Sequence, residues 1–226
     1  MKYPVSEIFS SLQGEGLCVG QRHIFIRFSG CNLACAYCDE GGKEPERLSG
    51  EQIIERVYAL EEKNGPHAYV SLTGGEPLLY AEDLVAICAF LKKDFRFYLE
   101  TNGVLFEHLA SLIGFLDMIA MDIKLQSVSG EKNQFAHNQA FLRCALEAHK
   151  DIFIKIIVGQ HTDTQEFREA VDLVAAVDAS VPLVIQPLTS DHTVEVRTLT
   201  DFSRVAAQRL DHVRVIPRLH KMLNIP

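Results

Sequence analysis

The sequence predicts an α/β fold in which about six parallel strands form a partial (β/α) barrel. Short apolar segments alternate with amphipathic ones along the 226 residues. The apolar segments lack a polar face, which indicates strands buried on both sides beneath a layer of helices. A closed eight-stranded barrel typically needs about 250 residues. We therefore expect an open, curved sheet within a single domain spanning 1–226; a flat, doubly wound sheet is the alternative.

The elements are expected in strict alternation. Strands are expected at 23–28, 68–72, 96–99, 118–121, 153–158, 183–186 and 213–216, where short apolar runs occur. Helices are expected between them at 82–93, 106–112, 134–148, 164–177 and 201–210, where apolar residues follow a helical period. An earlier helix should begin with a capping box at 49–52 and bury Ile53, Ile54, Val57 and Leu60. The crossovers should be right-handed.

Composition and charge indicate a protein that acts on small molecules. Hydrophobic residues make up 47% and charged residues 23% of the chain, and the net charge is −8. An acidic chain without clustered Lys and Arg does not fit a non-specific nucleic-acid binder. No apolar run reaches a membrane-spanning length, and the N-terminus has no signal-peptide core. We expect a cytoplasmic protein with neither a nucleic-acid nor a membrane partner.

Three cysteines in a short stretch are the most specific chemical signal. Cys31, Cys35 and Cys38 form a C-x3-C-x2-C run directly after the first expected strand. Three thiolates do not complete a structural zinc site, which normally has four ligands. They can hold three irons of a 4Fe–4S cluster and leave the fourth iron open. A degenerate zinc site or a disulfide patch is the alternative, and the scattered Cys18, Cys88 and Cys144 are expected in the core.

Polar and glycine-rich segments follow four of the later strands. Ligands gather at the carboxyl ends of parallel strands, so these segments should converge on one site. Gly74 and Gly75 let a backbone approach a ligand closely, and Glu76 can either meet an ammonium group or order the loop. The remaining candidates are Glu100 and Thr101 for ribose hydroxyls, a β-turn at Asn102-Gly103, Lys124 for a carboxylate or for pairing with Asp122, and Gln186-Pro187.

The two motifs together resemble the radical SAM superfamily. The C-x3-C-x2-C run has an aromatic residue, Tyr37, before its last cysteine, and 74–77 reads Gly-Gly-Glu-Pro. The resemblance implies that the open iron of the cluster binds S-adenosylmethionine (SAM) through its amine and carboxylate, and that 74–77 binds its amino group. It also implies that the reduced cluster cleaves SAM to a 5′-deoxyadenosyl radical.

Further segments resemble one family within this superfamily, the 7-carboxy-7-deazaguanine synthases. They are 7–16, 20–21, 25–33 and the ending 220–226. The resemblance implies conversion of 6-carboxy-5,6,7,8-tetrahydropterin to 7-carboxy-7-deazaguanine with loss of ammonia, started by removal of a hydrogen from C6. It further implies a flavodoxin or ferredoxin as electron donor, and a homodimer.

The resemblance assigns roles residue by residue. Cluster ligands are Cys31, Cys35 and Cys38. Substrate contacts are Leu12, Gln13, Gly14, Arg27, Thr73 and the terminal carboxylate of Pro226. SAM contacts are Tyr37, Cys38, Asp39, Gly74, Gly75, Glu76, Glu100, Asp122, Ile123, Lys124, Gln186, Pro187, Leu188 and Thr189.

Two substrate assignments also have a physical basis in the residues themselves. The turn 13–16 carries an amide and the carboxylate of Glu15, which can read the hydrogen-bonding edge of a pterin. Arg27 interrupts an apolar strand, and a buried guanidinium needs an anionic partner such as a substrate carboxylate. An ordinary loop at 13–16, and an internal ion pair or a water-facing position for Arg27, are the alternatives.

One position departs from the family pattern. The family commonly has a threonine that helps bind Mg²⁺ directly after Cys-Asp, whereas this chain has Glu40. A carboxylate is also a good Mg²⁺ ligand, so we expect the ion to bind here. Glu40 can equally mark a sibling radical SAM enzyme with another small-molecule substrate. Two rival interpretations of the whole chain are a glycyl-radical-enzyme activase and an iron–sulfur electron carrier.

Overall fold

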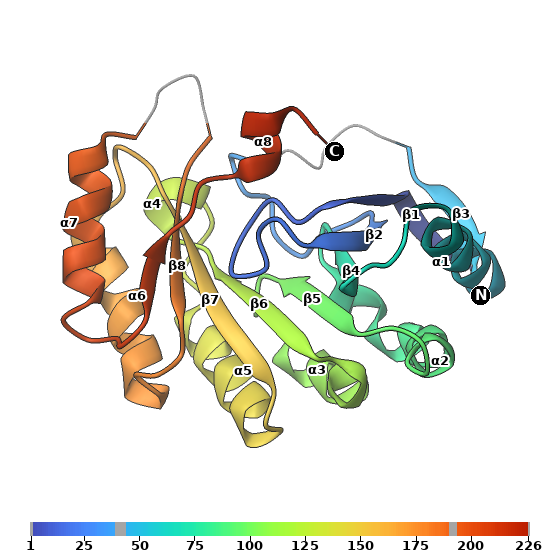
Figure 1. The fold of residues 1–226 in the computed structure, drawn as a ribbon. Coiled ribbons are helices and arrows are strands. Elements are labelled where there is room, and N and C mark those ends of the chain that lie inside the picture. Colours follow the sequence, from blue (N-terminus) through green and yellow to red (C-terminus); the bar gives the residue numbers. More distant parts are fainter. Residues whose placement is uncertain (1, 39–43, 190–193, 226) are drawn as a thin grey trace.

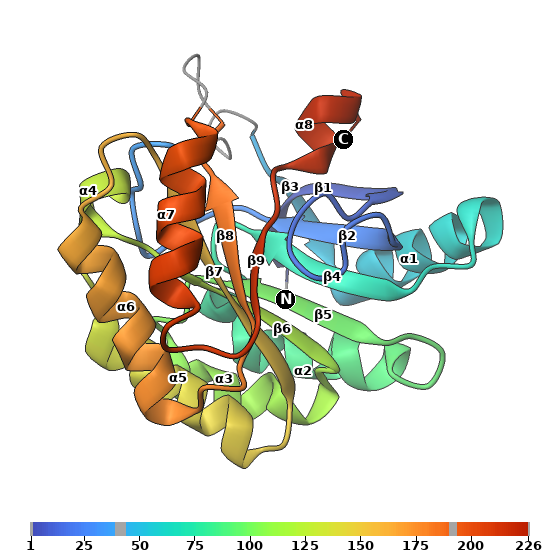
Figure 2. The ribbon, with the colours of Figure 1, turned by 60° about the vertical axis from the view of Figure 1, so that its left-hand side comes forward.

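The nine strands of the computed structural model form one open, curved sheet (Figures 1 and 2). The structure describes residues 2–38, 44–189 and 194–225. The strand order is β3-β1-β2-β4-β5-β6-β7-β8-β9; β1 is antiparallel to both its neighbours, and all other pairs are parallel. The strands are β1 (Lys2–Leu12), β2 (Arg22–Phe28), β3 (Glu46–Ser49), β4 (Tyr69–Gly74), β5 (Phe97–Thr101), β6 (Met118–Ile123), β7 (Asp151–Val158), β8 (Leu183–Pro187) and β9 (Val213–Val215).

Most helices cover one face of this sheet (Figures 1 and 2). They are α1 (Gly50–Asn64), α2 (Ala81–Leu91), α3 (Phe106–Leu112), α5 (Phe135–Glu147), α6 (Thr164–Val177) and α7 (Val196–Ala206). The short α4 (Gln126–Ser129) follows β6, and α8 (Leu219–Leu223) lies on the other side of the sheet, near β1 and β2. Single 3₁₀ turns occur at Pro77–Tyr80 and Ile113–Phe115.

The predicted open, curved parallel sheet is confirmed, and the flat doubly wound alternative is not what the chain forms. Every strand expected from the sequence is present, giving seven parallel strands rather than about six. Sequence reasoning missed β1 and β3. Residues 6–12 of β1 are mixed in polarity and only half-buried, and β3 has only four residues. Neither strand therefore shows the apolar run that marked the others.

The predicted boundaries of one helix are wrong. We expected a helix at 201–210, whereas α7 spans Val196–Ala206 and buries Phe202 and Ala206. The chain turns after Ala206: the amides of Arg209 and Leu210 both bond to its carbonyl oxygen. Leu210 is buried in the core from this turn and not from the helix.

Side chains alternate between the two faces of each parallel strand. On the helix-covered face, Leu72, Leu99, Met121, Ile154 and Ile185 belong to the main hydrophobic core. On the opposite, inner face, a smaller cluster forms near the amino ends of the strands from Tyr69, Tyr98, Ala120, Phe153 and Val184, with Cys18.

Two residues further along, each strand turns a polar side chain to the same inner face. These residues are Ser71, Glu100, Asp122, Lys155 and Gln186, and Thr73 follows on β4. The inner face is thus apolar at its base and polar at the carboxyl ends of the strands, which is where ligands bind in parallel α/β folds.

A buried hydrogen-bond chain fixes the pocket-lining strand β1 to the end of α1. His67 Nδ1 lies 2.5 Å from Glu61 Oε2, and His67 Nε2 lies 2.7 Å from Ser10 Oγ. A carboxylate only accepts hydrogen bonds, so Nδ1 donates to Glu61 and Nε2 accepts from the serine hydroxyl. These bonds add to the β1–β2 ladder in the part of β1 beyond Val5, where β3 no longer pairs with it.

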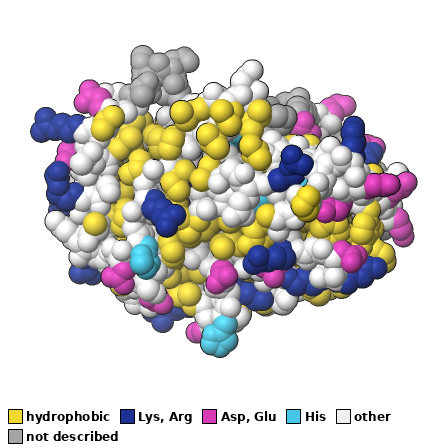
Figure 3. All heavy atoms as spheres, viewed as in Figure 1, with side chains coloured by type: hydrophobic (Ala, Val, Ile, Leu, Met, Phe, Trp, Pro, Cys, Tyr) yellow, Lys and Arg dark blue, Asp and Glu magenta, His cyan; other side chains and the backbone are white. Residues whose placement is uncertain are grey.

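The surface agrees with the acidic composition. Lys and Arg side chains are scattered over the face seen in Figure 3, among and around a broad spread of hydrophobic side chains, and form no single block there. Within the described part of the chain, no helix is long and apolar enough to cross a membrane.

The capping box of α1 makes a measurable contribution to stability. Ser49 Oγ accepts from the amide of Gln52, and Gln52 Oε1 accepts from the amide of Ser49 at 2.8 Å. We predict that Ser49→Ala lowers the free energy of unfolding by about 1 kcal/mol, measured by urea denaturation. Ser203→Ala, within α7, is the control and should leave it unchanged; an equal loss in both variants would contradict a capping role.

Candidate functional site

Two adjoining cavities open at the carboxyl ends of the strands. The first, of about 430 Å³, is lined by β1, β2 and the C-terminal segment, and the second by the cysteine loop and β4 to β8. Glu15, Thr73, Glu100 and Arg218 line both, so one wall is shared.

A clamp of polar groups orients Glu100 in that wall. Gln13 Nε2 donates to Glu100 Oε1 at 2.8 Å, and Thr73 Oγ1 donates to Glu100 Oε2 at 2.5 Å. The Gln13 side-chain oxygen accepts from the amide of Glu15 at 3.1 Å, and Gln13 is 2% exposed. The carboxylate is therefore fixed before any ligand arrives, with acceptor capacity left for a ligand N–H or O–H.

Arg27 lies at the other side of the first cavity, beside aromatic rings. Its guanidinium is 5.4 Å from the centre of the Phe9 ring, and Phe9 stacks on Phe25 with 5.0 Å between centroids. Arg27 Nε is 3.8 Å from the carboxylate of Glu7, and the Arg27 side chain is 26% exposed. Arg27 thus has the internal ion pair that was one alternative from the sequence, and it also lines the first cavity.

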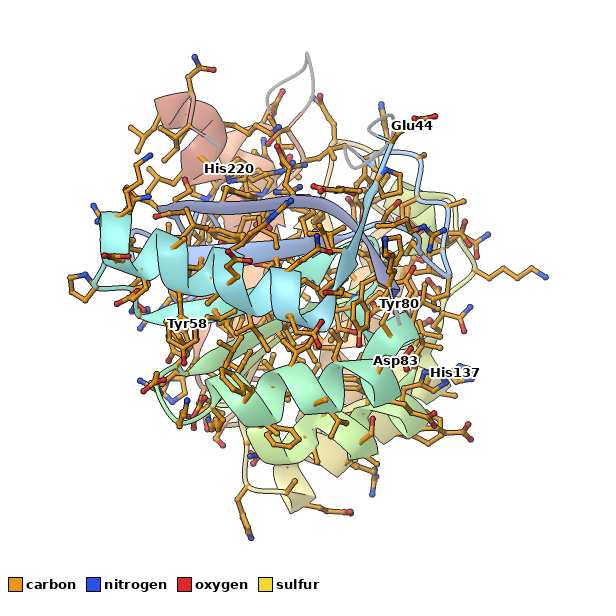
Figure 4. The ribbon with its side chains drawn as sticks, turned by 90° about the vertical axis from the view of Figure 1, so that its right-hand side faces the viewer. Glu44, Tyr58, Tyr80, Asp83, His137 and His220 are labelled. Atoms are coloured by element: carbon orange, nitrogen blue, oxygen red, sulfur yellow. The ribbon has the colours of Figure 1, made fainter. Side chains whose placement is uncertain are left out.

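The C-terminal segment closes the first cavity from above. Leu219 N donates to the Gly14 carbonyl at 2.8 Å, and His220, Lys221 and Ile225 line the cavity. Figure 4 shows His220 above β1. A Cβ atom on Gly14 would collide with the His220 ring, so glycine at 14 is what lets this segment approach.

The three clustered cysteines line the second cavity together with Tyr37 and Lys124. None is in a disulfide. Burial raises the pKa of Cys31 and of Cys35, which keeps these thiols protonated until a metal displaces the proton. Among the described residues, no three His, Cys, Asp or Glu side chains converge on one ion. A 4Fe–4S cluster does not need this, since each thiolate binds its own iron. The donor set fits that cluster.

Glu76 orders the loops around the cysteines instead of facing a cavity. Its fully buried carboxylate accepts from Leu78 N, Thr101 Oγ1 and Asn102 N at 3.1, 2.9 and 2.8 Å. Burial raises its pKa to about 7 against the effect of these donors. Of the two roles expected from the sequence, its side chain takes the loop-ordering one here.

The glycines at 74 and 75 serve a close approach between backbones. Gly74 has φ of +114°, and a Cβ at either position would collide with the carbonyl oxygen of Phe28 or Gly30. The amides of Gly75 and Glu76 donate to those same oxygens at 2.9 Å. Tyr80, labelled in Figure 4, adds a bond of 2.6 Å from its hydroxyl to the Ser29 carbonyl. The start of the cysteine loop is thereby fixed against the end of β4.

Unsatisfied polar atoms show that the second cavity is shaped for a polar ligand. Gln186 is fully buried and lines the cavity, and neither of its amide atoms has a hydrogen-bond partner among the described residues. Asp122 Oδ1 is also buried without a hydrogen-bond partner among the described residues, while Asp122 Oδ2 accepts a hydrogen bond from Lys124 Nζ at 2.8 Å. Buried polar atoms are rarely left unsatisfied, so these positions suit the polar groups of a ligand.

Comparisons with known proteins agree with this arrangement. Residues 25–174 match the family description "Radical SAM superfamily". The chain is 36% identical to the 7-carboxy-7-deazaguanine synthase of Geobacter sulfurreducens, over 97% of this chain and 96% of that protein. It is 32% identical to the enzyme of the same name from Archaeoglobus fulgidus, over the whole of both chains.

The chain belongs to the 7-carboxy-7-deazaguanine synthase family of radical SAM proteins. Solved structures share the fold: QueE from Escherichia coli has a TM-score of 0.63 at 24% identity, covering 95% of this chain and 94% of that one. The SAM-bound enzyme anSMEcpe has a TM-score of 0.58 at 16% identity, covering 82% and 61%. Radical SAM proteins carry a 4Fe–4S cluster and SAM, which are the two groups that the second cavity fits.

The structure of this family member brings most of the expected site residues together. The first cavity contains Leu12, Gln13, Gly14, Glu15, Arg27, Thr73 and Glu100; the second contains Tyr37, Cys38, Gly74, Gly75, Asp122, Lys124 and Gln186. Ile123, Pro187, Leu188 and Thr189 line neither cavity. Asp39, Glu40 and Pro226 lie outside the described residues.

Sequence reasoning missed four residues of this site. Asn102, expected only in a turn, donates through Nδ2 to Asn32 Oδ1 at 2.7 Å and lies 3.8 Å from Cys31 Sγ. Arg218 was not considered, and His220 was interpreted only as part of the family ending 220–226, in which Pro226 alone was given a role at the substrate. Lys155 interrupts an apolar strand just as Arg27 does, and that signal was available in the sequence.

We predict that Glu76→Gln loosens the cysteine loop. The amide offers one acceptor oxygen, so its NH₂ faces a backbone N–H that the carboxylate satisfies now. The free energy of unfolding should fall by about 2 kcal/mol, measured by chemical denaturation. Glu82→Gln, exposed at the start of α2, is the control. Equal stability of both variants would show that the carboxylate is not needed to hold the loops.

Proposed function

We propose that this protein converts 6-carboxy-5,6,7,8-tetrahydropterin to 7-carboxy-7-deazaguanine with release of ammonia. The observation that carries the proposal is the pairing of the two cavities. One has a guanidinium at one side and fixed carboxylates at the other, and it shares a wall with the cavity of the three cysteines. The similarity to enzymes named for this product, over nearly the full chain, supports the same reaction.

The first cavity matches the polarity of this substrate. A tetrahydropterin carries a carboxylate at one end and a row of N–H donors at the other. Arg27 binds the carboxylate through its bidentate fork, and Glu100 and Glu15 accept from the N–H groups. The stacked Phe9 and Phe25 flank the ring system, and the C-terminal segment excludes water.

The second cavity holds the cofactors beside it. Cys31, Cys35 and Cys38 hold the cluster, and Gln186, Asp122 and Lys124 bind the polar groups of SAM. When bound, the reduced cluster supplies the electron that cleaves SAM and so provides the radical that starts the rearrangement. The shared wall of Thr73 and Glu100 keeps the substrate next to SAM, and the protein contributes this positioning while the cofactors carry the chemistry.

Mg²⁺ and a protein reductant complete the proposed system. We propose Glu40 as a Mg²⁺ ligand, because a carboxylate suits this hard cation, and a flavodoxin or ferredoxin as the electron donor. Equal activity in chelated, metal-free buffer and with added Mg²⁺ would refute the metal site.

The direct test is an anaerobic assay of the reconstituted protein with SAM, reductant, Mg²⁺ and 6-carboxytetrahydropterin, read by mass spectrometry. We expect 7-carboxy-7-deazaguanine to appear, and none with the Cys38→Ser variant as the blank. If SAM is cleaved to 5′-deoxyadenosine without this product, the radical SAM class stands and the substrate differs. A glycyl-radical-enzyme activase would instead require a protein substrate.

Arg27 provides a sharper test of how the substrate binds. Arg27→Gln removes the charge that pairs with the carboxylate and should raise KM by about 100-fold, as expected for loss of a bidentate charged pair. Arg27→Lys keeps the positive charge but not the bidentate guanidinium, so its KM should lie between those of the wild type and Arg27→Gln. Arg22→Gln, on the same strand but outside this cavity, is the control. Unchanged KM in Arg27→Gln would contradict the assigned orientation.

A further inference from the structure

Lys155 is a buried cation in the wall where the two cavities meet. It comes from the middle of β7, whose other residues are almost all apolar, and it is 7% exposed. Its ammonium forms an ion pair with Glu15 Oε2 and lies 3.2 Å from Asp122 Oδ2. Glu15 lines both cavities and Asp122 lines the second. One ammonium thus joins a carboxylate of the substrate cavity to a carboxylate of the SAM cavity.

The strand register makes this bridge a fixed part of the fold. Asp122 and Lys155 are direct partners in the parallel ladder between β6 and β7, so their side chains leave the sheet side by side on the inner face. Glu15 reaches the same point from the loop after β1. An ammonium has three donors and no acceptor, which suits two carboxylates at once.

The electrostatics of the wall depend on this bridge. The charged and titratable groups that act on Glu15 or Lys155 are Asp122, Glu100, Lys124, Arg218, His220 and Tyr98, and Lys124 shares Asp122 Oδ2 with Lys155. Burial alone raises the pKa of Glu15, but the attraction of Lys155, followed by that of Arg218 and His220, outweighs it and lowers the pKa to about 2. Glu15 and Asp122 both contact the Lys155 ammonium and Glu100 also acts on it, so this cation offsets the mutual repulsion of the three carboxylates.

We propose that Lys155 is a positioning residue that keeps Glu15 ionised and aimed into the substrate cavity while holding Asp122 in place for SAM. The part concerning substrate rests on the proposed function. An ionised Glu15 only accepts hydrogen bonds, and so selects a ligand that presents N–H donors. A protonated Glu15 would present a donor of its own in place of one acceptor and would bind that ligand more weakly.

The test compares Lys155→Met, which keeps the length of the side chain and removes its charge, with Lys155→Arg, which keeps the charge. Lys63→Met, exposed at the end of α1, is the matched control. The probe is 6-carboxypterin, a redox-stable relative of the proposed substrate, and its affinity for the cluster-loaded protein is measured without turnover by calorimetry. SAM affinity is measured separately, and thermal unfolding checks that each variant is folded.

We expect Lys155→Met to bind 6-carboxypterin about 100-fold more weakly near neutral pH. Its affinity should also rise with pH as Glu15 loses its proton, because the pKa of Glu15 moves up when the main attracting charge is removed. Lys155→Arg should follow the wild-type pH profile. The difference between the Lys155→Met and Lys155→Arg profiles isolates the effect of the charge at position 155.

The outcomes separate this proposal from the proposed function. A Lys155→Met variant with the wild-type pH profile and wild-type SAM affinity would overturn it. A loss of affinity that is independent of pH and equal in Lys155→Arg would indicate packing alone, and also overturns it.

If the wild type does not bind 6-carboxypterin, the proposed substrate fails. SAM affinity then decides: about a 10-fold loss in Lys155→Met, restored in Lys155→Arg, supports the bridge to Asp122, and no loss refutes it.

Discussion

The change from apolar to polar residues along the inner face of five neighbouring strands is the constraint on which this site depends. Tyr98, Ala120, Phe153 and Val184 form an apolar cluster on the inner face, and two residues later along the same four strands come Glu100, Asp122, Lys155 and Gln186. The two-residue period of a strand fixes this step. A slip of one residue in β5, β6 or β7 would move the charge of Glu100, Asp122 or Lys155 toward the hydrophobic core on the other face.

Several side chains and loops of the site are held in position by the protein itself, before any ligand binds. Glu100 is held by Gln13 and Thr73, and the cysteine loop is held by Glu76 and by the backbone contacts of Gly74 and Gly75. Burying these polar groups is costly unless each is paired. Glu100 and Glu76 have such pairs, whereas Gln186 and Asp122 Oδ1 are among the buried polar groups for which the described residues offer no hydrogen-bond partner, and a ligand can supply one.

The sequence was sufficient for the curved parallel sheet and for most of the site, because both follow from local patterns. Apolar runs marked the buried strands, and the cysteine spacing with the Gly-Gly-Glu-Pro segment marked the cofactor loops. It was not sufficient for β1, whose half-buried residues face a cavity and lack an apolar pattern. Nor did it separate the two roles of Glu76, because only the fold brings Asn102 N and Leu78 N to its carboxylate. Arg218 and His220 belong to the site through a long-range contact with Gly14 that no local pattern encodes.

The central claim is that the shared wall places the substrate next to SAM. The most direct measurement is to supply 6-carboxytetrahydropterin carrying deuterium at C6 and to analyse 5′-deoxyadenosine and recovered SAM by mass spectrometry. If the two cavities hold substrate and SAM as described, deuterium from C6 should appear at the 5′ carbon of both molecules. Formation of 7-carboxy-7-deazaguanine without deuterium at that carbon would contradict the account.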